Sequence, residues 1–338
     1  FSFLEKPVDA EVLSPLLSDL KVLETNGIQC SHVNLRGTVA AIAGDNLASH
    51  SIGGFLESFT GSALSRLCRF CSGTRDQMQT CSDASMFKLR TAEEYDHQAN
   101  IVAKHPDMSS VYGLKKTCVL NELKYFHAVS GLPPDIMHDL LEGVIAYDLC
   151  LVIPKMISEN LFNVQWLNEQ IRQWHYGPLD KRNKPCELSK DFEKKSKLSM
   201  NAGRVWCFIR LLPLMLYKQV PEDNPSFMLI KLLREIVTIV FSTALSISHI
   251  SYLETLITDH HDLLCEMFPD SPLKPKHHHI LHYPDMILRF GPLHNMWCMR
   301  FEAKHYYYKK VVQCTKNFKN IPLTAATRSQ LLQASYNK

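Results

Sequence analysis

The feature that most constrains the fold is an unbroken apolar run at residues 38–43, TVAAIA, which stops abruptly at Gly44-Asp45-Asn46. The run has no alternating polar positions, which is typical of a central strand buried on both faces of a sheet. An acidic residue at the carboxyl end of such a strand, beside a glycine, is where an α/β sheet often places a functional carboxylate. Asp-Asn pairs are also common turn formers, so Asp45 is either a site residue or a solvated turn residue.

A Cys-x-x-Cys pair, Cys68 and Cys71, follows a segment rich in Gly and Ser. Such a pair supplies two of the four ligands of a tetrahedral zinc ion. The sequence indicates a structural zinc site or a free, reduced pair, because no second Cys-x-x-Cys completes the usual pattern. A redox pair is disfavoured, since no thioredoxin-like βαβ pattern surrounds it. The candidates for the two missing zinc ligands lie in the turn-rich residues 72–114 and are Cys81, His97 and His105.

A second metal-like pattern is the run His277-His278-His279 with His282. His278 and His282 are spaced to share one face of a helix, as two metal ligands could. No thiol or carboxylate is placed in the neighbouring sequence to complete a metal site, and prolines at 275 and 284 bracket the run. We therefore expect a short packed helix here and no metal.

Pro133-Pro134-Asp135 breaks any preceding helix, and Asp135 is well placed to cap a new helix that extends to about Ile157. His138 and Glu142 then lie one turn apart on the same helical face. From the residues alone, a helix cap and an intrahelical pair account for this motif.

Three apolar segments at residues 202–217, 226–248 and 252–268 have helical periodicity. The middle segment is long enough to raise the question of a membrane span, but Lys231, Arg234 and Glu235 interrupt it. We expect buried bundle helices and no membrane partner. Residues 14–26 predict a further helix near the amino end, and the charged residues 178–199 predict an exposed loop.

The 338 residues, 46% hydrophobic and 21% charged, can bury a substantial core. The net charge of +3 is only mildly basic, so a nucleic-acid partner has to be argued from local patches. Eleven cysteines without disulfide-framework spacing favour a reducing compartment. Because the chain begins at Phe1 in apolar sequence, we expect it to be the interior of a longer protein.

After Glu302 the sequence contains no Asp or Glu, while lysines recur and Tyr306-Tyr307-Tyr308 lies among them. One-signed charge with interleaved aromatic residues suits a phosphate backbone and exposed bases. An ordinary basic helix and tail is the alternative, and both interpretations stay open. The candidate DNA-binding residues are Lys304, Lys309, Lys310, Lys316 and Lys319.

Three blocks of this chain resemble the transposases of CACTA (En/Spm)-type DNA transposons and their animal relatives. The first is LRGTVAAIAGDNLASHSIGGF at 35–55 followed by CRFC at 68–71, and the second is PDIMH at 134–138. The third is HHILHYPDMILRFGPLHNMWCMRFE at 278–302. The blocks span most of the chain and keep the order that they have in the family.

The resemblance implies an RNase H-like α/β core interrupted by a large, mainly α-helical insertion. In that family three carboxylates hold two Mg²⁺ ions, which activate the attacking oxygen and stabilise the leaving oxygen during DNA cleavage and strand transfer. Asp45 matches the second carboxylate and Glu302 the third, with Glu142 in reserve for the third. Asp135 and His138 match a motif that supports the active site. The early strands and the first aspartate have no counterpart, so we expect a transposase fragment that is inactive by itself.

The resemblance also implies a domain division, a partner and a compartment. We expect part of the core at 1–48, the Cys-x-x-Cys segment at 49–130, the helical insertion at 131–275, and closing helices with a basic tail at 276–338. DNA is the expected partner, as transposon ends or non-specific duplex, in the nucleus. A homo-oligomer is compatible with this interpretation.

Two other interpretations remain. The chain could be a domesticated, non-catalytic module that binds DNA or protein, with Cys68 and Cys71 purely structural. An unrelated zinc-stabilised helical scaffold would be favoured if Asp45 and Glu302 lay far apart.

Overall fold

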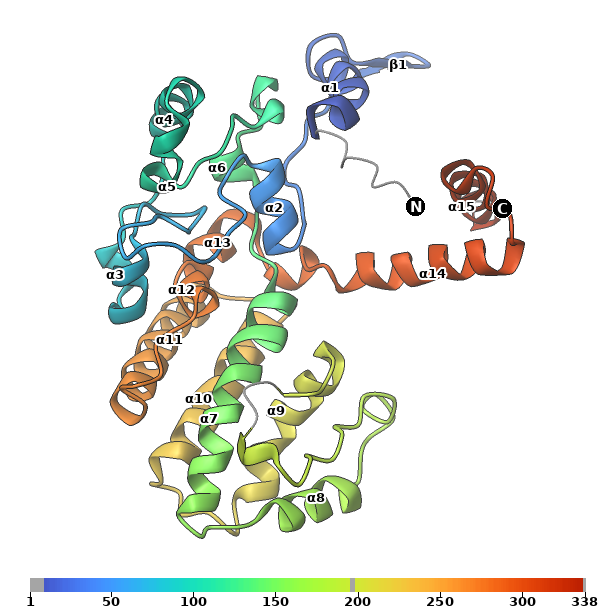
Figure 1. The fold of residues 1–338 in the computed structure, drawn as a ribbon. Coiled ribbons are helices and arrows are strands. Elements are labelled where there is room, and N and C mark those ends of the chain that lie inside the picture. The colour runs from blue at the N-terminus through green and yellow to red at the C-terminus, as the bar shows by residue number, and fades with distance from the viewer. Residues whose placement is uncertain (1–8, 195–197, 337–338) are drawn as a thin grey trace. The chain divides into compact units, whose positions relative to one another are not determined.

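The computed structural model describes residues 9–194 and 198–336, which form two compact units (Figure 1). The first unit extends to Met296 and the second begins at Trp297. The described residues are mostly helical and contain a single sheet of two short strands. The RNase H-like arrangement therefore stays a prediction.

The first helix, α1 (Asp9–Thr25), covers and extends the helix predicted at 14–26. The chain turns away after the helix at Gly27, whose positive φ of 75° suits a residue without a Cβ atom. Strands β1 (Ile28–Cys30) and β2 (Val33–Leu35) then form an exposed antiparallel hairpin.

The buried central strand predicted at residues 38–43 is absent from the structure. These residues belong to neither a helix nor a strand, and Ala40 is exposed. Ile42 N donates a hydrogen bond to Gly131 O, but no adjacent strand among the described residues supplies a ladder. A run of small apolar residues forms a strand only where a neighbour pairs with its backbone groups. Here Val39 and Ile42 pack against the core without such a partner among the described residues.

Short helices and loops between residues 46 and 131 surround the first part of the core. Tyr95 is fully buried at its centre, where its hydroxyl donates to Gly53 O at 2.7 Å and accepts from Cys118 N at 3.0 Å. The elements are α2 (Asn46–Ile52), α3 (Arg75–Thr80), η1 (Ala84–Met86), α4 (Ala92–Lys104), η2 (Pro106–Met108), α5 (Ser109–Tyr112), η3 (Val119–Glu122) and α6 (Ala128–Gly131). Core residues of this part are Leu17, Phe55, Ala99, Val102, Leu114, Leu120, Phe126 and Leu132.

A bundle of apolar helices forms the second part of the core. Its helices are η4 (Met137–Val144), a π-helical segment, and α7 (Ile145–Ser158), α8 (Val164–Gln173), α9 (Ala202–Leu216) and α10 (Pro225–Val240). Helix α10 packs against α7, α9 and α11 (Ile247–Met267) (Figure 1). The three predicted apolar helices are confirmed, except that the middle one ends at Val240, before Ser246 caps the next. No described helix combines the length and apolarity that crossing a bilayer requires.

Within the loop predicted at 178–199, the described residues 178–194 and 198–199 form mostly exposed turns around η5 (Phe192–Lys194), as the charged sequence predicts. Two ion pairs hold this loop to the bundle. Arg172 pairs with Glu187, and Arg210 pairs with Asp180.

Two short helices bring the histidine run to the Cys-x-x-Cys segment. They are α12 (Pro275–Ile280) and α13 (Tyr283–Phe290), followed by η6 (Leu293–Asn295). Helix α12 packs against both α3 and η4, and α13 packs against α11. This placement joins segments that are about two hundred residues apart in the sequence.

The second unit consists of α14 (Met299–Thr315) and α15 (Ile321–Tyr336), which pack against each other. The chain turns between them at Lys316, which has a positive φ of 51°. The hydroxyls of Tyr308 and Ser329 lie 3.0 Å apart across the pair. The helix predicted to contain Glu302 is present as α14.

Candidate metal centre

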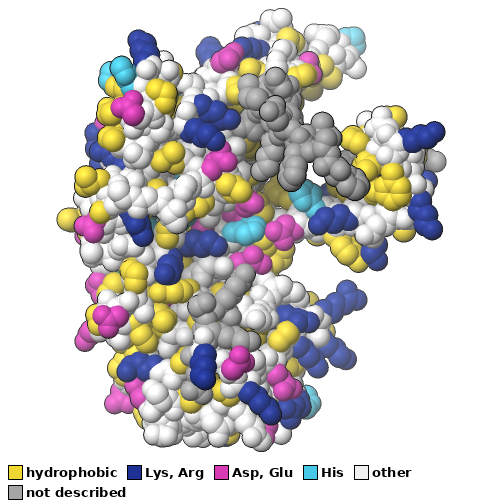
Figure 2. Space-filling model, viewed as in Figure 1, with side chains coloured by type: hydrophobic (Ala, Val, Ile, Leu, Met, Phe, Trp, Pro, Cys, Tyr) yellow, Lys and Arg dark blue, Asp and Glu magenta, His cyan; other side chains and the backbone are white. Residues whose placement is uncertain are grey.

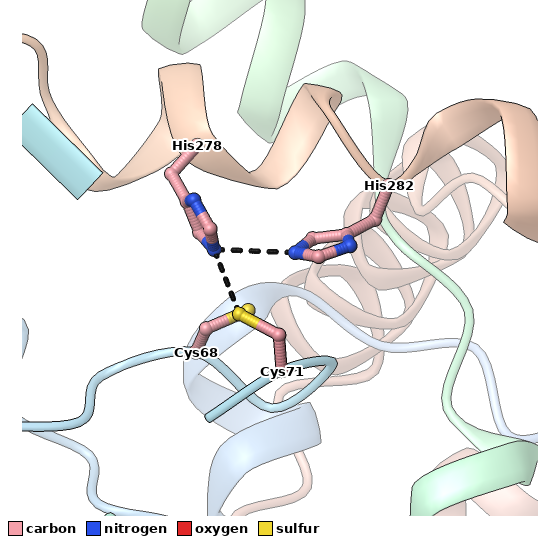
Figure 3. Close-up of side chains that lie close together, drawn as sticks. All are labelled: Cys68, Cys71, His278 and His282. Carbon is pink, nitrogen blue, oxygen red and sulfur yellow. Dashed lines mark hydrogen bonds between the residues drawn. The ribbon is translucent and has the colours of Figure 1, made fainter. Parts of the chain in front are cut away.

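The segment around Cys68 and Cys71 folds as a tight knuckle with both sulfur atoms turned to the same side (Figure 3). Phe70 N donates to Cys68 Sγ at 3.3 Å, and Gly73 N donates to Cys71 Sγ at 3.4 Å. Backbone amides aimed at sulfur favour thiolate over thiol, because they stabilise negative charge. The knuckle is therefore shaped to present two thiolates.

Arg90 closes the back of this knuckle. Its Nε atom donates to Cys68 O at 3.1 Å and to Cys71 O at 3.0 Å, and Arg90 N donates to Phe70 O. Burial lowers the pKa of the Arg90 guanidinium, and the nearby Cys68 and Cys71 sulfurs oppose this shift. A buried cation beside two sulfurs is compensated when those sulfurs are ionised.

His278 and His282 reach the knuckle from the other side (Figure 3). Pro275 occupies the first turn of α12, where its missing N–H costs nothing. His278 lies on α12 and His282 in the turn before α13, not on one continuous helix as predicted, and both imidazoles still reach the knuckle. His278 Nε2 lies 3.1 Å from Cys71 Sγ and 3.1 Å from His282 Nε2. A ring nitrogen either donates one hydrogen or accepts one. His278 Nε2 therefore cannot form well-ordered hydrogen bonds with both Cys71 Sγ and His282 Nε2, and a shared metal ion explains the close approach of all three atoms better.

The four side chains fit a tetrahedral zinc ion. Their ligand atoms all lie within 4.8 Å of one another, and all four residues are buried. Zn–N bonds of about 2.0 Å and Zn–S bonds of about 2.3 Å would separate the ligand atoms by roughly 3.3–3.8 Å. With four protein ligands and no access to solvent, the site has the character of a structural rather than a catalytic centre.

The pKa values around the cluster favour one thiolate, one thiol and a neutral imidazole at His278 before a metal binds. Burial alone would raise the pKa of the Cys68 thiol, but the hydrogen bond with Cys71 and the imidazoles of His278 and His282 lower it well below its usual value. Burial and the Cys68 sulfur raise the pKa of Cys71 well above its usual value. Burial lowers the pKa of His278 to about 4, which keeps its ring neutral, as a ligand must be.

Arg69, between the two cysteines, connects the centre to the segment after Asp45. Its side chain is buried, its guanidinium lies over the Phe70 ring, and Nη1 donates to Asn46 Oδ1 at 2.8 Å. Nη2 donates to Pro133 O at 3.1 Å. The guanidinium thus ties together α2, the metal knuckle and the segment before η4.

Asp139 on η4 is the buried acceptor of this network. Its Oδ1 accepts from Asn46 Nδ2 at 2.6 Å and from His279 Nδ1 at 3.3 Å, and its Oδ2 accepts from the Tyr283 hydroxyl at 3.4 Å. Burial alone would raise the pKa of the Asp139 carboxyl, but His279, Arg69 and Asn46 lower it. The carboxylate is therefore ionised and holds α2, α12 and α13 together.

A second buried carboxylate, Asp148 on α7, anchors the start of α12. Asp148 accepts from His277 Nε2 at 2.9 Å and from His260 Nε2 at 3.0 Å. His277 Nδ1 in turn accepts from Lys274 N. Burial would raise the pKa of Asp148, but His277 and His260 lower it well below its usual range. The run His277-His278-His279 thus divides its side chains among Asp148, the metal centre and Asp139.

Cys68 and Cys71 belong to a candidate zinc site, as predicted, but the other two ligands are His278 and His282 and not the expected residues. Cys81 caps the end of α3, and His97 and His105 are exposed on α4 and at its end, so none of the three joins the cluster. The expectation that the histidine run holds no metal site is corrected as well, because the thiols that complete it come from a distant segment.

Asp45 caps helix α2 and is half-buried. Its Oδ1 accepts from Ala48 N at 2.7 Å, which is the local role open to any aspartate before a helix. Glu302 is exposed in the first turn of α14, in the other compact unit. Glu142 is exposed on η4, with one carboxylate oxygen 4.0 Å from His138 Nε2.

The motif residues Asp135 and His138 contact each other directly. Asp135 is fully buried, its Oδ1 accepts from Met137 N at 3.2 Å, and its Oδ2 lies 2.5 Å from His138 Nδ1. The predicted helix cap is therefore present, and it extends to a buried carboxylate–imidazole pair. Asp139, next to this motif, was not singled out from sequence, because one Asp among helical apolar residues carries no distinguishing pattern.

The lysines predicted to bind DNA all belong to the second unit. Lys304, Lys309 and Lys310 lie on α14, Lys316 ends it, and Lys319 lies in the following turn. Lys304 Nζ lies over the rings of Tyr307 and Tyr308, and Lys310 Nζ lies over Tyr306. In the first unit, Lys and Arg side chains are interspersed with Asp and Glu over the face shown in Figure 2.

Within the described residues, the Cys₂His₂ cluster is the one group of three or more His, Cys, Asp or Glu side chains able to hold a metal ion. An oxygen-lined magnesium site is therefore not found among these residues. No protein-family model matches the chain, and no curated protein is significantly similar to it.

Proposed function

We propose that the chain is part of the catalytic domain of a CACTA-like DDE/D transposase that acts on DNA in the nucleus. The buried Cys₂His₂ cluster would hold a structural zinc ion beneath the catalytic segment. The basic second unit would supply affinity for the DNA backbone, because lysines that contact phosphates release counterions.

The observation that carries the proposal is the meeting of the three blocks that resemble the family. Asn46 belongs to the first block, Asp139 follows the second, and His279 belongs to the third, and they share one buried hydrogen-bond network. The metal cluster joins the first and third blocks a second time through Cys71 and His278. Blocks that resemble a family in order and also meet in space fit a shared fold better than unrelated matches would.

In the proposed reaction Asp45 and Glu302 would help to hold magnesium. A bound pair of magnesium ions would activate the attacking oxygen and stabilise the leaving oxygen of a phosphodiester. To bind magnesium, Asp45 would have to give up its hydrogen bond with Ala48 N or bind the ion through its other oxygen. Two carboxylates without a third hold magnesium poorly, because the ion requires near-octahedral oxygen ligation. We therefore expect no DNA cleavage by this chain alone.

A non-catalytic module is the second candidate function. It is favoured by the closed character of the metal cluster and by the use of Asp45 as a helix cap. In that case zinc and the buried network serve stability alone, and DNA or protein binding requires neither Asp45 nor Glu302. A zinc-stabilised helical scaffold unrelated to transposases would behave in the same way.

Plasmid nicking separates these functions. The chain, and a version extended upstream by its natural coding sequence, are incubated with supercoiled plasmid and Mg²⁺ or Mn²⁺. The proposal predicts no nicking by the chain and nicking by the extended protein, abolished by Asp45→Asn and by Glu302→Gln. An extended, zinc-loaded protein that binds DNA but never nicks it would favour the non-catalytic module.

A further inference from the structure

A cavity of about 290 Å³ lies beside the buried network, between α2, η4 and α12. Buried Asn46 and His279 line it together with Lys274, Lys276, Glu142 and Phe59. These residues come from all three parts of the chain that the network joins. The cavity is therefore formed by the tertiary structure and not by one local segment.

His279 is oriented within this cavity by Asp139. The Asp139 carboxylate accepts from His279 Nδ1 at 3.3 Å, and His279 Nε2 has no hydrogen-bond partner among the described residues. The Phe59 and Phe70 rings lie edge-on to the imidazole, at centroid distances of 6.3 Å and 6.1 Å. Because Nδ1 carries the proton that Asp139 accepts, the orientation of the His279 ring in the cavity is fixed.

Two lysines supply positive charge at the same cavity. Lys276 Nζ donates to His138 O at 2.7 Å, which uses one of its three N–H groups and fixes the ammonium in place. Lys274 Nζ lies 4.7 Å from the centroid of the Tyr147 ring. Among the described residues that line the cavity, Glu142 is the one carboxylate. Asp139 lies behind His279 and Asn46 and is engaged by three donors.

The cations continue past Phe59 into an adjoining cavity of about 240 Å³. Phe59, Lys274 and Pro275 line both cavities, and the second also contains Arg75. Charges repeated on either side of an aromatic ring suit a single strand, whose phosphates are bound by cations while a base contacts the ring. A lone small anion would need only one of the two cavities.

We propose that the cavity lined by Asn46, His279, Lys274 and Lys276 binds a backbone phosphate of a DNA strand, with Phe59 against the adjacent base. The proposal rests on the proposed function and deepens it, because it places the substrate strand beside Asp45. The two ammonium groups contact the phosphate oxygens, and the His279 ring lines the cavity beside them. Asp139 is a positioning residue that holds His279 and Asn46.

The test measures binding of an eight-nucleotide oligothymidylate to the zinc-loaded chain by fluorescence anisotropy. The Lys274→Ala/Lys276→Ala variant should weaken binding about tenfold or more, because it removes two charge-assisted hydrogen bonds to phosphate. The matched control, Lys218→Ala/Lys231→Ala, removes the same charge from the first unit outside both cavities and should change binding less than about twofold. Equal weakening by the two double variants would overturn the proposal.

A second readout reports on the ring nitrogen itself. In ¹⁵N-histidine-labelled protein, inorganic phosphate should shift the His279 Nε2 resonance, and the shift should disappear in Lys274→Ala/Lys276→Ala. An unchanged His279 resonance at saturating oligothymidylate would contradict the proposal. Because all variants keep the metal ligands, zinc content and duplex binding through the second unit should stay normal. If only the cavity proposal is wrong, the cavity variants bind oligothymidylate normally while zinc binding and nicking by the extended protein are retained. If the transposase proposal is wrong, zinc binding or nicking by the extended protein is absent.

Discussion

Arg69 donates a 2.8 Å hydrogen bond to Asn46, so the residue between the two metal-ligating cysteines holds the residue that follows Asp45. The side-chain Nδ2 atom of Asn46 donates to the Asp139 carboxylate. The same carboxylate accepts from His279, which is adjacent in the sequence to the metal ligand His278. The metal cluster and the Asp45 turn therefore share one buried network. A substitution at the cluster should therefore alter the stability of the amino end of α2.

Replacement of Arg69 tests this connection. Arg69→Met leaves Asn46 Oδ1 and Pro133 O buried without their donors, and it should reduce the free energy of unfolding by about 2–5 kcal/mol. Hydrogen exchange at Ala48 N, which Asp45 caps, should accelerate. Cobalt substituted for zinc should keep its tetrahedral absorption spectrum, because the four ligands are untouched. The control Arg66→Met, in the same segment, should cost less than about 1 kcal/mol, and an equal loss in both variants would argue against a specific role of Arg69.

Loss of a metal ligand should have a larger effect than loss of a supporting residue. Cys68→Ser and His282→Ala should each weaken zinc binding by at least roughly 100-fold, because residues that merely support a ligand already contribute about 10–100-fold. Cys81→Ser is the matched control, since Cys81 lies outside the cluster, and it should retain one zinc per chain. Zinc content after dialysis, measured by mass spectrometry, distinguishes these outcomes. A chain that loses zinc on Cys81→Ser would have a different ligand set.

The Asp148 carboxylate should make stability depend on pH. Its folded-state pKa is depressed, so its contribution is complete above the unfolded-state pKa of about 3.9 and is lost as pH falls below that value. Asp148→Asn should therefore cost about 1–3 kcal/mol at pH 7. The difference from wild type should begin to narrow between about pH 5 and about pH 3, as chemical denaturation at several pH values would show. A difference that stays constant over this range would mean that Asp148 is not ionised in the folded protein.

The basic second unit should bind duplex DNA without sequence preference. Lys309→Ala/Lys310→Ala should weaken binding to any duplex and reduce the slope of log K against log salt concentration by about one for each phosphate that is no longer neutralised. A salt titration of duplex affinity measures that slope. Lys155→Ala/Lys231→Ala, which removes the same charge from the first unit, is the control. An unchanged slope in the Lys309/Lys310 variant would remove this unit from DNA binding.

The long apolar helices of the bundle were predictable from the sequence, whereas α3 and α4 lie within residues 72–114, which the sequence indicated only as turn-rich. The segments now seen as α9, α10 and α11 have strong apolar periodicity, and caps such as Asn224 and Ser246 mark their beginnings. The strand prediction at residues 38–43 was wrong because a strand requires a neighbouring strand to pair with, and apolar composition does not show whether one is present. Asp45 is a half-buried helix cap and not a solvated turn residue, and its role in chemistry stays a prediction.

The metal cluster was predictable only in halves. Cys68 and Cys71 indicated two ligands, and His278 and His282 had the spacing of two more, but 207 positions separate Cys71 from His278. Local sequence contains no information that pairs such distant motifs. The pairing follows from the packing of α12 against α3 and η4, which depends on the buried carboxylates Asp139 and Asp148.

X-ray absorption at the zinc edge of the purified chain tests the metal centre most directly. The structure predicts one zinc per chain with two sulfur neighbours at about 2.3 Å and two imidazole nitrogens at about 2.0 Å. In His278→Ala/His282→Ala the imidazole scattering should disappear along with most of the metal. A zinc-free protein that is as stable as wild type after Cys68→Ser, or a bound zinc with other than two sulfur ligands, would contradict the Cys₂His₂ centre on which this account rests.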